Sequence, residues 1–415
     1  MRLLWGAAVI SDIGTWVQLI VVGSLVAANT GSAVKTGLVA LATFMPQGIA
    51  APVGGLLADR FDRRKVFAAC LLAQAAATAV LAVVLHAGVR SNWVLTGIIL
   101  LAGSAGATGG PAYAAMQPDL VPEDELMAMV SLGAYSWNSG RIVGPMVGSA
   151  MAWWVGPAGT VAFNAATYVV MAIAVSLVRR PFPPHDVDGD ASLRERMRTG
   201  YRALKSTPGC RFGVSWLVMV NLTVVPFMGL IPIYVRSEFA GGTRATGFTA
   251  SAQGVGAILG GITVTYLATK FSRSWILRRL VLVLGAVFAG YALAPTLGWL
   301  APVAALMGAG ASSMFITMSS VVQRDAPPAQ RGRVVALMQA ATGTSYGLGL
   351  LFLGGLGDLT DLRVAFLTGS VLLVVAFTVI TSRMRWWRAA MDGTPVDIEP
   401  VGQAGVAARQ AFQVR

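Results

Sequence analysis

The sequence predicts an all-α membrane protein with twelve transmembrane helices, arranged as two parallel six-helix repeats. Three observations support this fold class. The 415 residues are 55% hydrophobic and have a mean hydropathy of +0.68, which is far outside the range of soluble proteins. Apolar segments recur along the chain, and each is near or above the roughly 20 residues that a bilayer requires. The second half of the chain also repeats residues of the first half.

The apolar segments divide into two sets of six. We expect them at residues 3–29, 36–58, 66–87, 93–116, 127–155, 159–178, 211–237, 246–268, 277–296, 299–322, 334–357 and 363–382. The predicted organisation is an N-terminal six-helix bundle at 1–178, a cytoplasmic linker with an amphipathic basic helix at 179–210, a C-terminal six-helix bundle at 211–383 and a disordered cytoplasmic tail at 384–415.

The repeat has a constant offset of 206 residues. Gln47-Gly48 recurs as Gln253-Gly254, and Gln117-x-Asp119-x-x-Pro122 recurs as Gln323-x-Asp325-x-x-Pro328. One offset serves the second, fourth and fifth segments against the eighth, tenth and eleventh, which indicates a duplicated unit. Because six spans are an even number, both copies have the same orientation, as parallel repeats about an axis along the membrane normal.

The distribution of basic residues predicts the orientation in the membrane. With both termini placed in the cytoplasm, 25 of the 31 Lys and Arg lie on the cytoplasmic side, five lie on the other side, and Arg141 lies inside a span. This asymmetry is typical of cytoplasmic loops in a bacterial inner membrane. We therefore attribute the net charge of +13 to topology and to contact with anionic lipids, and we expect no binding of nucleic acid.

The sequence offers no site for enzyme chemistry. Gly343–Gly347 has the G-x-S-x-G pattern of serine hydrolases, but it lies within a predicted span and has no strand before it. No phosphate-binding loop is present, so an ion gradient is the expected energy source rather than ATP. Cys70 and Cys210 have no metal-ligand partner at useful spacing. We expect no enzymatic activity, no cofactor and no metal site.

A charged loop joins the second and third spans. It reads Gly55-x-x-Ala58-Asp59-Arg60-x-x-Arg63-Arg64, and its charges must face water. This pattern resembles the loop between helices 2 and 3 of the major facilitator superfamily (MFS). The resemblance implies a conformational-switch loop that comprises Gly55, Asp59, Arg60, Arg63 and Arg64. The acidic exit at 117–125 either pairs with an arginine of this loop or is a solvated helix cap.

The fifth span carries a second motif. Gly140-x-x-x-Gly144-Pro145-x-x-Gly148 resembles the helix-5 motif of MFS antiporters, which is associated with export. The three glycines share one helix face, so a partner helix can approach closely, and Pro145 permits a bend. Ser149 departs from the family pattern, because a second glycine is usual there.

Two ionisable residues inside the spans are candidates for proton coupling. Asp12 lies about a third of the way into the first span and Arg141 lies in the fifth, and charge within a bilayer is costly unless it has a function or a partner. Many drug/proton antiporters of the family carry an arginine in helix 4, whereas residues 93–116 have no charge. We therefore expect Asp12 and Arg141 to couple protons together. The alternatives are solvation of Asp12 at the cytoplasmic mouth and a structural pairing of Arg141 with backbone or with Asp12.

Further polar, aromatic and sulfur-containing residues within the spans are candidates for lining a substrate cavity. They are Trp16, Tyr113, Asn138, Asn221, Gln253, Met314, Thr317, Gln339 and Tyr346. Methionines at helical spacing are more often packing residues, although flexible thioethers suit a pocket for varied apolar ligands.

Smaller features narrow the resemblance to the bacterial branch of enterobactin exporters and macrolide-efflux proteins. They include Gly14-Thr15-Trp16, Arg141-x-x-Gly144-Pro145 and Arg331-Gly332-Arg333. The resemblance implies a monomer that exports an amphipathic small molecule, such as a siderophore, a macrolide or another drug, in exchange for protons by alternating access. An importer or facilitator of a small nutrient is the alternative, and a non-transporting membrane receptor or assembly factor is the second.

Overall fold

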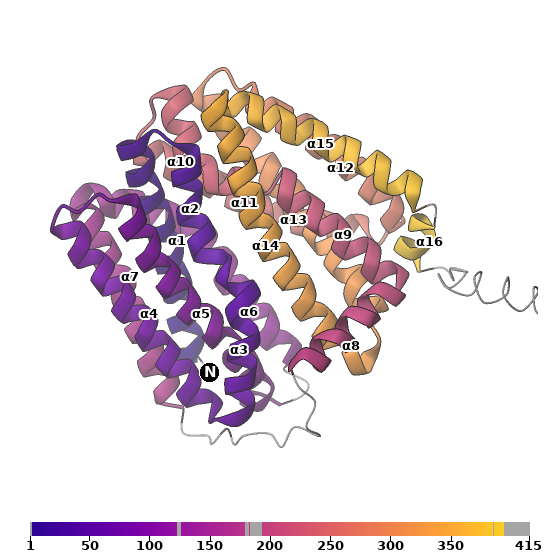
Figure 1. Cartoon of the computed structure of the whole chain (residues 1–415), viewed down its shortest axis with the longest axis horizontal. Coiled ribbons are helices and arrows are strands. Elements are labelled where there is room, and N and C mark those ends of the chain that lie inside the picture. The colour runs from indigo at the N-terminus through magenta and orange to yellow at the C-terminus, as the bar shows by residue number, and fades with distance from the viewer. Residues whose placement is uncertain (1, 123–125, 179–181, 183–192, 385, 394–415) are drawn as a thin grey trace, which may run out of the picture.

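The computed structural model describes residues 2–122, 126–178, 182, 193–384 and 386–393. These residues form helices joined by short connections, and no β-strand occurs among them (Figure 1). In the first half the helices are α1 Arg2–Thr30, α2 Ala33–Phe44, α3 Pro46–Arg60, α4 Arg63–His86, α5 Asn92–Leu120, α6 Leu126–Trp154 and α7 Gly156–Ser176. They continue with α8 Leu193–Ser206, α9 Pro208–Thr223, α10 Phe227–Phe239, α11 Thr243–Leu267, α12 Arg273–Ala292, α13 Leu297–Asp325, α14 Arg331–Leu359, α15 Leu362–Arg383 and α16 Trp387–Asp392.

The helices confirm the predicted fold class. Ten helical segments in the described part of the chain are long and apolar enough to cross a membrane, and the bent pair α2–α3 makes eleven. Helix α6, with 29 residues, is also long enough to cross a membrane, although it is not among these apolar candidates. Two expected spans are broken: α2 ends at Phe44 and α3 begins at Pro46, with a bend of 47° between Ala33–Gly48 and Val53–Arg60, and α9 and α10 meet at Pro226. Proline causes such breaks because it lacks the N–H that continues the helix.

The two halves of the chain lie side by side, α1–α7 as one bundle and α9–α15 as the other (Figure 1). The same helix pairs pack in each half at the repeat offset. The pair α1–α6 recurs as α9–α14, α3–α5 as α11–α13, and α4–α7 as α12–α15. The structure therefore contains the parallel duplication that the sequence predicts.

Helix α6 lies directly on the backbone of α1 through the glycines of the fifth-span motif. A Cβ atom on Gly140 would lie 2.8 Å from the carbonyl carbon of Asp12, and one on Gly144 would lie 2.5 Å from Cβ of Trp16. A Cβ on Gly148 would lie 3.0 Å from the backbone of Val17. Larger residues would push the two helices apart, so the glycines fix where the side chains of α1 stand relative to α6.

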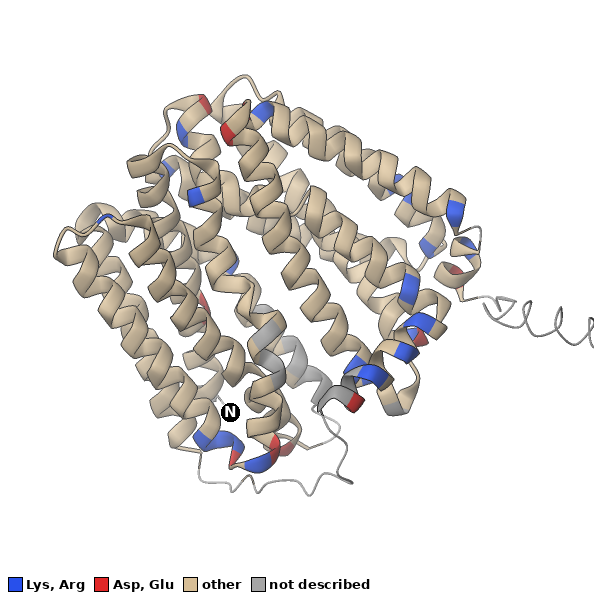
Figure 2. Cartoon of the chain, in the orientation of Figure 1, with Lys and Arg blue, Asp and Glu red and all other residues tan. Residues whose placement is uncertain are grey.

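Charged residues gather at the ends of the helices (Figure 2). We name the two ends of the bundle by this charge. The basic end carries the 60–65 loop, α8 and the start of α14 at Arg331, and the opposite end carries the connections between α1 and α2 and between α14 and α15.

Direct contacts between the two halves concentrate toward the opposite end. Asp358, near the end of α14, accepts hydrogen bonds from Ser32 Oγ (2.5 Å) and from the backbone N–H of Val34 (3.1 Å), and so caps the start of α2. Deeper in the bundle, Ser251 Oγ of α11 donates to the carbonyl oxygen of Ile142 on α6 (2.6 Å). The halves are thus joined at the opposite end by Asp358 and deeper in the bundle by Ser251.

Within the first half, an arginine of the 60–65 loop forms an ion pair at the basic end. Arg63 Nη1 lies 3.3 Å from Asp119 Oδ2 at the end of α5, and Arg64 Nη1 donates to the carbonyl oxygen of Val178 (2.6 Å). Asp62 caps α4 by accepting from the backbone N–H groups of Arg64 and Lys65. Of the two alternatives for the acidic exit, the structure therefore contains the pairing with an arginine.

At the basic end of the second half, the short helix α16 packs against the bundle instead of an arginine loop. Asp392 at the end of α16 accepts hydrogen bonds from Ser274 N–H (2.9 Å) and Ser274 Oγ (2.6 Å) at the start of α12. Arg324 Nη2 donates to the carbonyl oxygen of Ala390 (2.7 Å). The first part of the expected tail is thus a helix docked on the bundle. The prediction of disorder otherwise concerns 394–415, which lie outside the described residues.

The linker helix α8 lies against the start of α14. Arg333 Nη1 donates to Thr199 Oγ1 (3.1 Å), and a Cβ on Gly200 would lie 3.0 Å from Cβ of Arg333. The helix begins at Leu193, as expected for the amphipathic segment.

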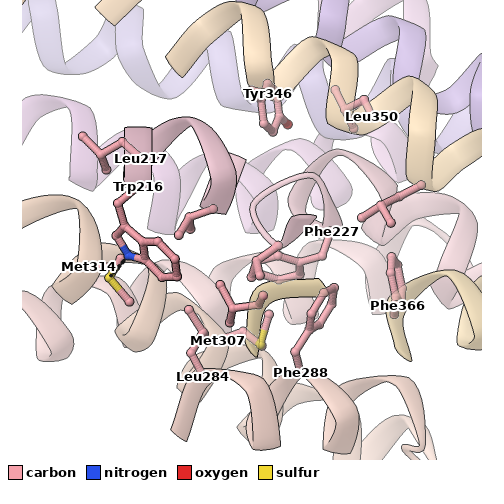
Figure 3. Packing of buried hydrophobic residues seen from close by; sticks show 14 of the residues in the cluster. Trp216, Leu217, Phe227, Leu284, Phe288, Met307, Met314, Tyr346, Leu350 and Phe366 are labelled. Atoms are coloured by element: carbon pink, nitrogen blue, oxygen red, sulfur yellow. Dashed lines mark hydrogen bonds between the residues drawn. The ribbon is translucent and has the colours of Figure 1, made fainter. Parts of the chain in front are cut away.

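The interior of the second half is a packed core of aromatic and sulfur-containing side chains (Figure 3). Trp216 of α9 is fully buried, and its indole N–H points at the sulfur of Met314 at 3.0 Å. Phe227 and Phe288 pack with ring centroids 6.2 Å apart. Such a core leaves the second half as a tightly filled block.

Candidate functional site

A cavity of about 370 Å³ lies inside the first half, among α1, α2, α3, α4, α5, α6 and α7. This volume is within the range of small-molecule sites. Its polar and amphipathic lining consists of Ser11, Asp12, Thr15, Gln18, Thr43, Gln47, Gln74, Tyr113, Ser136, Trp137 and Tyr168. Phenylalanine, leucine, isoleucine, methionine, alanine and glycine side chains form the remainder. We call this space the first-half cavity.

Asp12 is the one formally charged side chain among the described residues that line the first-half cavity. It accepts a hydrogen bond from Ser136 Oγ of α6. The close packing of Gly140 on its backbone sets the distance between α1 and α6 at this point. A carboxylate inside a membrane-spanning bundle and without a counter-charge is costly, so it is suited to binding a proton or a cation.

A network of neutral polar groups supports the wall behind Asp12. The hydroxyls of Thr15 and Tyr168 share a hydrogen bond of 2.9 Å, and Asn164 Nδ2 donates to Gln18 Oε1 at 2.7 Å. Asn164 Nδ2 also lies 3.3 Å from the Tyr168 hydroxyl. These bonds lock the facing side chains of α1 and α7, so this wall of the cavity is preorganised.

The opposite wall combines aromatic rings with an amide. Tyr113 of α5 stacks on Phe67 of α4 with ring centroids 4.9 Å apart. Gln74 lies against Gly106, where an added Cβ would come within 2.7 Å of its amide nitrogen. The cavity therefore presents aromatic faces and hydrogen-bonding groups together, as a site for an amphipathic molecule requires.

A second, much smaller pocket of about 20 Å³ lies between the two halves. Arg141 lines it from α6, and its Nε donates to Gln253 Oε1 of α11 at 3.2 Å. Its Nη2 points at the sulfur of Met228 on α10 at 3.4 Å. Trp16 and Tyr346 also line this space. We call it the seam pocket because α1, α2 and α6 of one half and α10, α11 and α14 of the other enclose it.

An aromatic cluster lies between the two spaces. Trp16 contacts Phe44 and Trp137 with centroid distances of 6.0 and 5.5 Å, and Phe44 contacts Tyr346 at 6.1 Å. Phe44 lines both the first-half cavity and the seam pocket. The cluster thus separates the space that contains the acid from the space that contains the base.

The structure does not bring Asp12 and Arg141 together. No ion pair joins them among the described residues, and each faces a different space. The reason is helical geometry: Gly140 faces α1, and the next residue on a helix points about 100° away around the axis. The coupling role of each residue stays a prediction, but a direct pair between them does not occur in this structure.

The other cavity candidates are divided among several environments. Tyr113 lines the first-half cavity, and Trp16, Gln253 and Tyr346 line the seam pocket. Five candidates line neither space: Asn138, which is half-buried on α6; Gln339, which is exposed on α14; Asn221 and Thr317, which donate to backbone carbonyls of their own helices; and Met314, which lies in the second-half core.

The loop candidates also differ in their surroundings. Arg63 and Arg64 are bonded as described above, Asp59 is half-buried, and Arg60 is exposed. Gly54, rather than Gly55, meets the backbone of α5 at Thr108, whereas a Cβ on Gly55 would meet nothing within 4 Å.

Several residues of the first-half cavity were missed by the sequence reasoning. They are Gln18, Phe44, Gln74, Ser136, Trp137 and Tyr168. The signal that could have found them is a polar or large aromatic side chain inside an apolar span, which is costly unless it faces a cavity or a partner.

Comparison with known proteins identifies the family. The model of the family described as "transmembrane secretion effector", which belongs to the major facilitator superfamily, matches residues 1–405. The multidrug efflux pump Tap of Mycolicibacterium fortuitum is 27% identical over 400 residues, covering 93% of this chain and 96% of Tap. Macrolide efflux protein A of Streptococcus pyogenes is 22% identical over 376 residues, covering 89% and 92% of the two chains.

Solved structures show the same fold. The nucleoside transporter NupG has a TM-score of 0.69 at 15% identity, over 92% of this chain and 100% of that chain. A bacterial homologue of the human lysosomal transporter Spinster, in an inward-facing and unoccupied conformation, has a TM-score of 0.71 at 16% identity, over 95% and 98% of the chains. With the match over nearly its whole length, the chain belongs to the transmembrane secretion effector family of the major facilitator superfamily, and it is a multi-span membrane transporter rather than an enzyme.

Proposed function

We propose that this transporter exports amphipathic small molecules from a bacterial cell in exchange for protons. The observation that carries the proposal is the first-half cavity, in which Asp12 is the one charged side chain among the described lining residues. The names of the relatives, a multidrug efflux pump and a macrolide efflux protein, agree with export of such molecules.

The exchange follows from competition for one carboxylate. When Asp12 is ionised, it attracts a molecule that carries a basic amine, and the aromatic faces of Phe67 and Tyr113 accommodate the apolar part. When Asp12 binds a proton, that attraction is lost and the molecule leaves. Because proton and substrate exclude one another at the same oxygen atoms, their movements are coupled in opposite directions. This charge favours basic drugs of the macrolide kind over anionic siderophores.

The direction of transport follows from the proposed orientation. The basic end faces the cytoplasm by the distribution of Lys and Arg, with anionic lipid headgroups around it. The halves are joined at the opposite end by Asp358 and deeper in the bundle by Ser251. This arrangement is the closed external side of an alternating-access cycle, in which a monomer loads substrate from the cytoplasmic side.

The test measures transport by the purified full chain in proteoliposomes under an imposed proton gradient. A radiolabelled macrolide is the probe, and Asp12→Asn is compared with Glu195→Gln, which removes an exposed charge on α8 outside both pockets. We expect Asp12→Asn to abolish gradient-driven transport and Glu195→Gln to retain it.

Full gradient-driven transport by Asp12→Asn would refute the coupling role of this carboxylate. The direction is measured separately, in right-side-out and inverted vesicles. Net uptake into right-side-out vesicles when the gradient points inward would support the nutrient importer, and no movement of any compound would support a non-transporting protein.

A further inference from the structure

The seam pocket between the halves is lined by the positively charged Arg141 and by three neutral residues that can donate hydrogen bonds, but by no Asp or Glu. The three neutral residues are Trp16, Gln253 and Tyr346. We propose that it binds a small anion, either a free halide or a single carboxylate group, and that this anion stabilises closure at the opposite end. The site is distinct from the first-half cavity, so the proposal does not depend on proton exchange at Asp12.

The first argument concerns Arg141. Its guanidinium has five N–H donors, and among the described residues its hydrogen-bond partners are the neutral amide oxygen of Gln253 and the sulfur of Met228. No Asp or Glu occurs among the residues that line the seam pocket. A partly buried guanidinium without a carboxylate is costly, and an anion would compensate its charge.

The second argument concerns two buried donors that have no partner in the described structure. The indole N–H of Trp16 and the amide nitrogen of Gln253 are both inaccessible to solvent and make no hydrogen bond. The two residues are 6% and 2% exposed, and both line the seam pocket. Buried polar groups are nearly always satisfied, so orphaned donors beside a cation indicate a missing acceptor.

The third argument is size. A space of about 20 Å³ holds a single small species, comparable to one water molecule. A water molecule would accept hydrogen bonds but would add two donors and leave the charge of Arg141 uncompensated. A chloride ion or the tip of one carboxylate brings acceptor capacity and negative charge together. Sulfate and gluconate are too large for this space.

The position of the pocket gives the anion a conformational effect. Trp16 and Arg141 belong to the first half, and Gln253 and Tyr346 belong to the second. The residues that line the pocket therefore lie together only while the halves are in contact. An anion that binds this arrangement and not the separated halves shifts the equilibrium toward it.

The test uses the purified full chain in lipid nanodiscs. Its unfolding temperature is followed while chloride replaces gluconate at constant ionic strength, with sulfate and acetate as further probes. We expect a saturable rise with chloride or acetate and none with sulfate. A response to chloride identifies a free halide as a ligand, whereas a response to acetate alone identifies a carboxylate, such as one carried by a substrate. No response to either would overturn the proposal.

Variants locate the site. Arg141→Gln should abolish the response, and Trp16→Phe, which keeps an aromatic ring but loses the N–H, should weaken the apparent affinity about fivefold. Gln253→Glu places a carboxylate beside Arg141, so it should remove the response while the protein stays stable without added anion. Arg244→Gln is the matched control, because Arg244 is exposed over the ring of Trp153 and does not line the seam pocket. A response retained in both Arg141→Gln and Gln253→Glu would place the anion elsewhere and overturn the proposal.

Discussion

The two halves share one helix arrangement but have different interiors. In the first half, Gly54 of α3 meets the backbone of α5 at Thr108, and in the second half the equivalent Gly260 of α11 also meets the backbone of its neighbour α13, at Ala309. The small residues that set helix spacing therefore recur at the repeat offset. The side chains between those helices do not: one half encloses a polar cavity, and the other is filled.

Corresponding positions show how the difference arises. At the offset of 206 residues, Asp12 corresponds to Val218 and Tyr168 to Val374. At the same offset Gln74, whose amide lies on Gly106, corresponds to the apolar Leu280. The two halves thus share a backbone arrangement, but polar side chains lie between the helices of the first half and apolar side chains lie between those of the second.

The largest expected effect tests this difference in packing directly. Trp216→Ala in the second-half core should lower the free energy of unfolding by about 3–5 kcal/mol, because a fully buried indole leaves a cavity. Trp137→Ala should cost less than about 1 kcal/mol, because Trp137 is 38% exposed and borders a space that is already open. Denaturant unfolding in detergent measures both values, and equal losses would contradict a filled second half beside a hollow first half.

The next effect concerns the contact that positions Asp12. Gly140→Ala should destabilise the protein by about 1–3 kcal/mol, since its Cβ would overlap the backbone of α1. Gly97→Ala on α5 is the matched control, because nothing lies within 4 Å of its Cβ position, and alanine should gain up to about 1 kcal/mol there. Thermal unfolding of the two variants measures both changes in stability. If Gly140→Ala were as stable as Gly97→Ala, α1 and α6 would not be held by this close approach.

The fold was largely predictable from the sequence, and the site only in part. Span positions, the repeat and the glycine face of α6 follow from local composition and spacing, so they could be read without the structure. The division of Asp12 and Arg141 between two spaces could not be read, because it depends on how faces of α1, α6 and α11 meet. Gln47 and Gln253 illustrate the limit: they match in the repeat, yet Gln47 lines the first-half cavity and Gln253 the seam pocket.

A smaller effect is expected where the halves join at the opposite end. Asp358→Ala removes the bonds from one half to the start of α2 in the other, each of which is worth about 1 kcal/mol or less net. The ratio of closed to open molecules should fall about tenfold. Spin labels at Lys35→Cys and Leu359→Cys, with both native cysteines replaced by alanine, report the distance across this join, since both positions are exposed.

The matched control for this join is Asp361→Ala. Asp361 caps α15 by accepting from the N–H of Arg363, so it performs the same chemistry within one half. Its loss should lower stability without changing the distance between the labels. A longer distance in both variants would show that the join responds to general loosening, and an unchanged distance in Asp358→Ala would show that Asp358 does not hold the halves together.

The smallest effect compares the two basic ends. Asp392→Ala should release α16 from the start of α12 and cost about 1 kcal/mol, so the first turn of α12 should exchange amide hydrogens about fivefold faster. Asp119→Ala breaks an ion pair whose acid is 45% exposed, and such a pair is worth about 0–1 kcal/mol and weakens with salt. Hydrogen exchange at low and high salt separates the two cases. A salt-sensitive Asp392 and a salt-insensitive Asp119 would reverse this assignment, because the Asp392 cap consists of hydrogen bonds to the neutral Ser274, whereas Arg63 and Asp119 form a charge pair that salt screens.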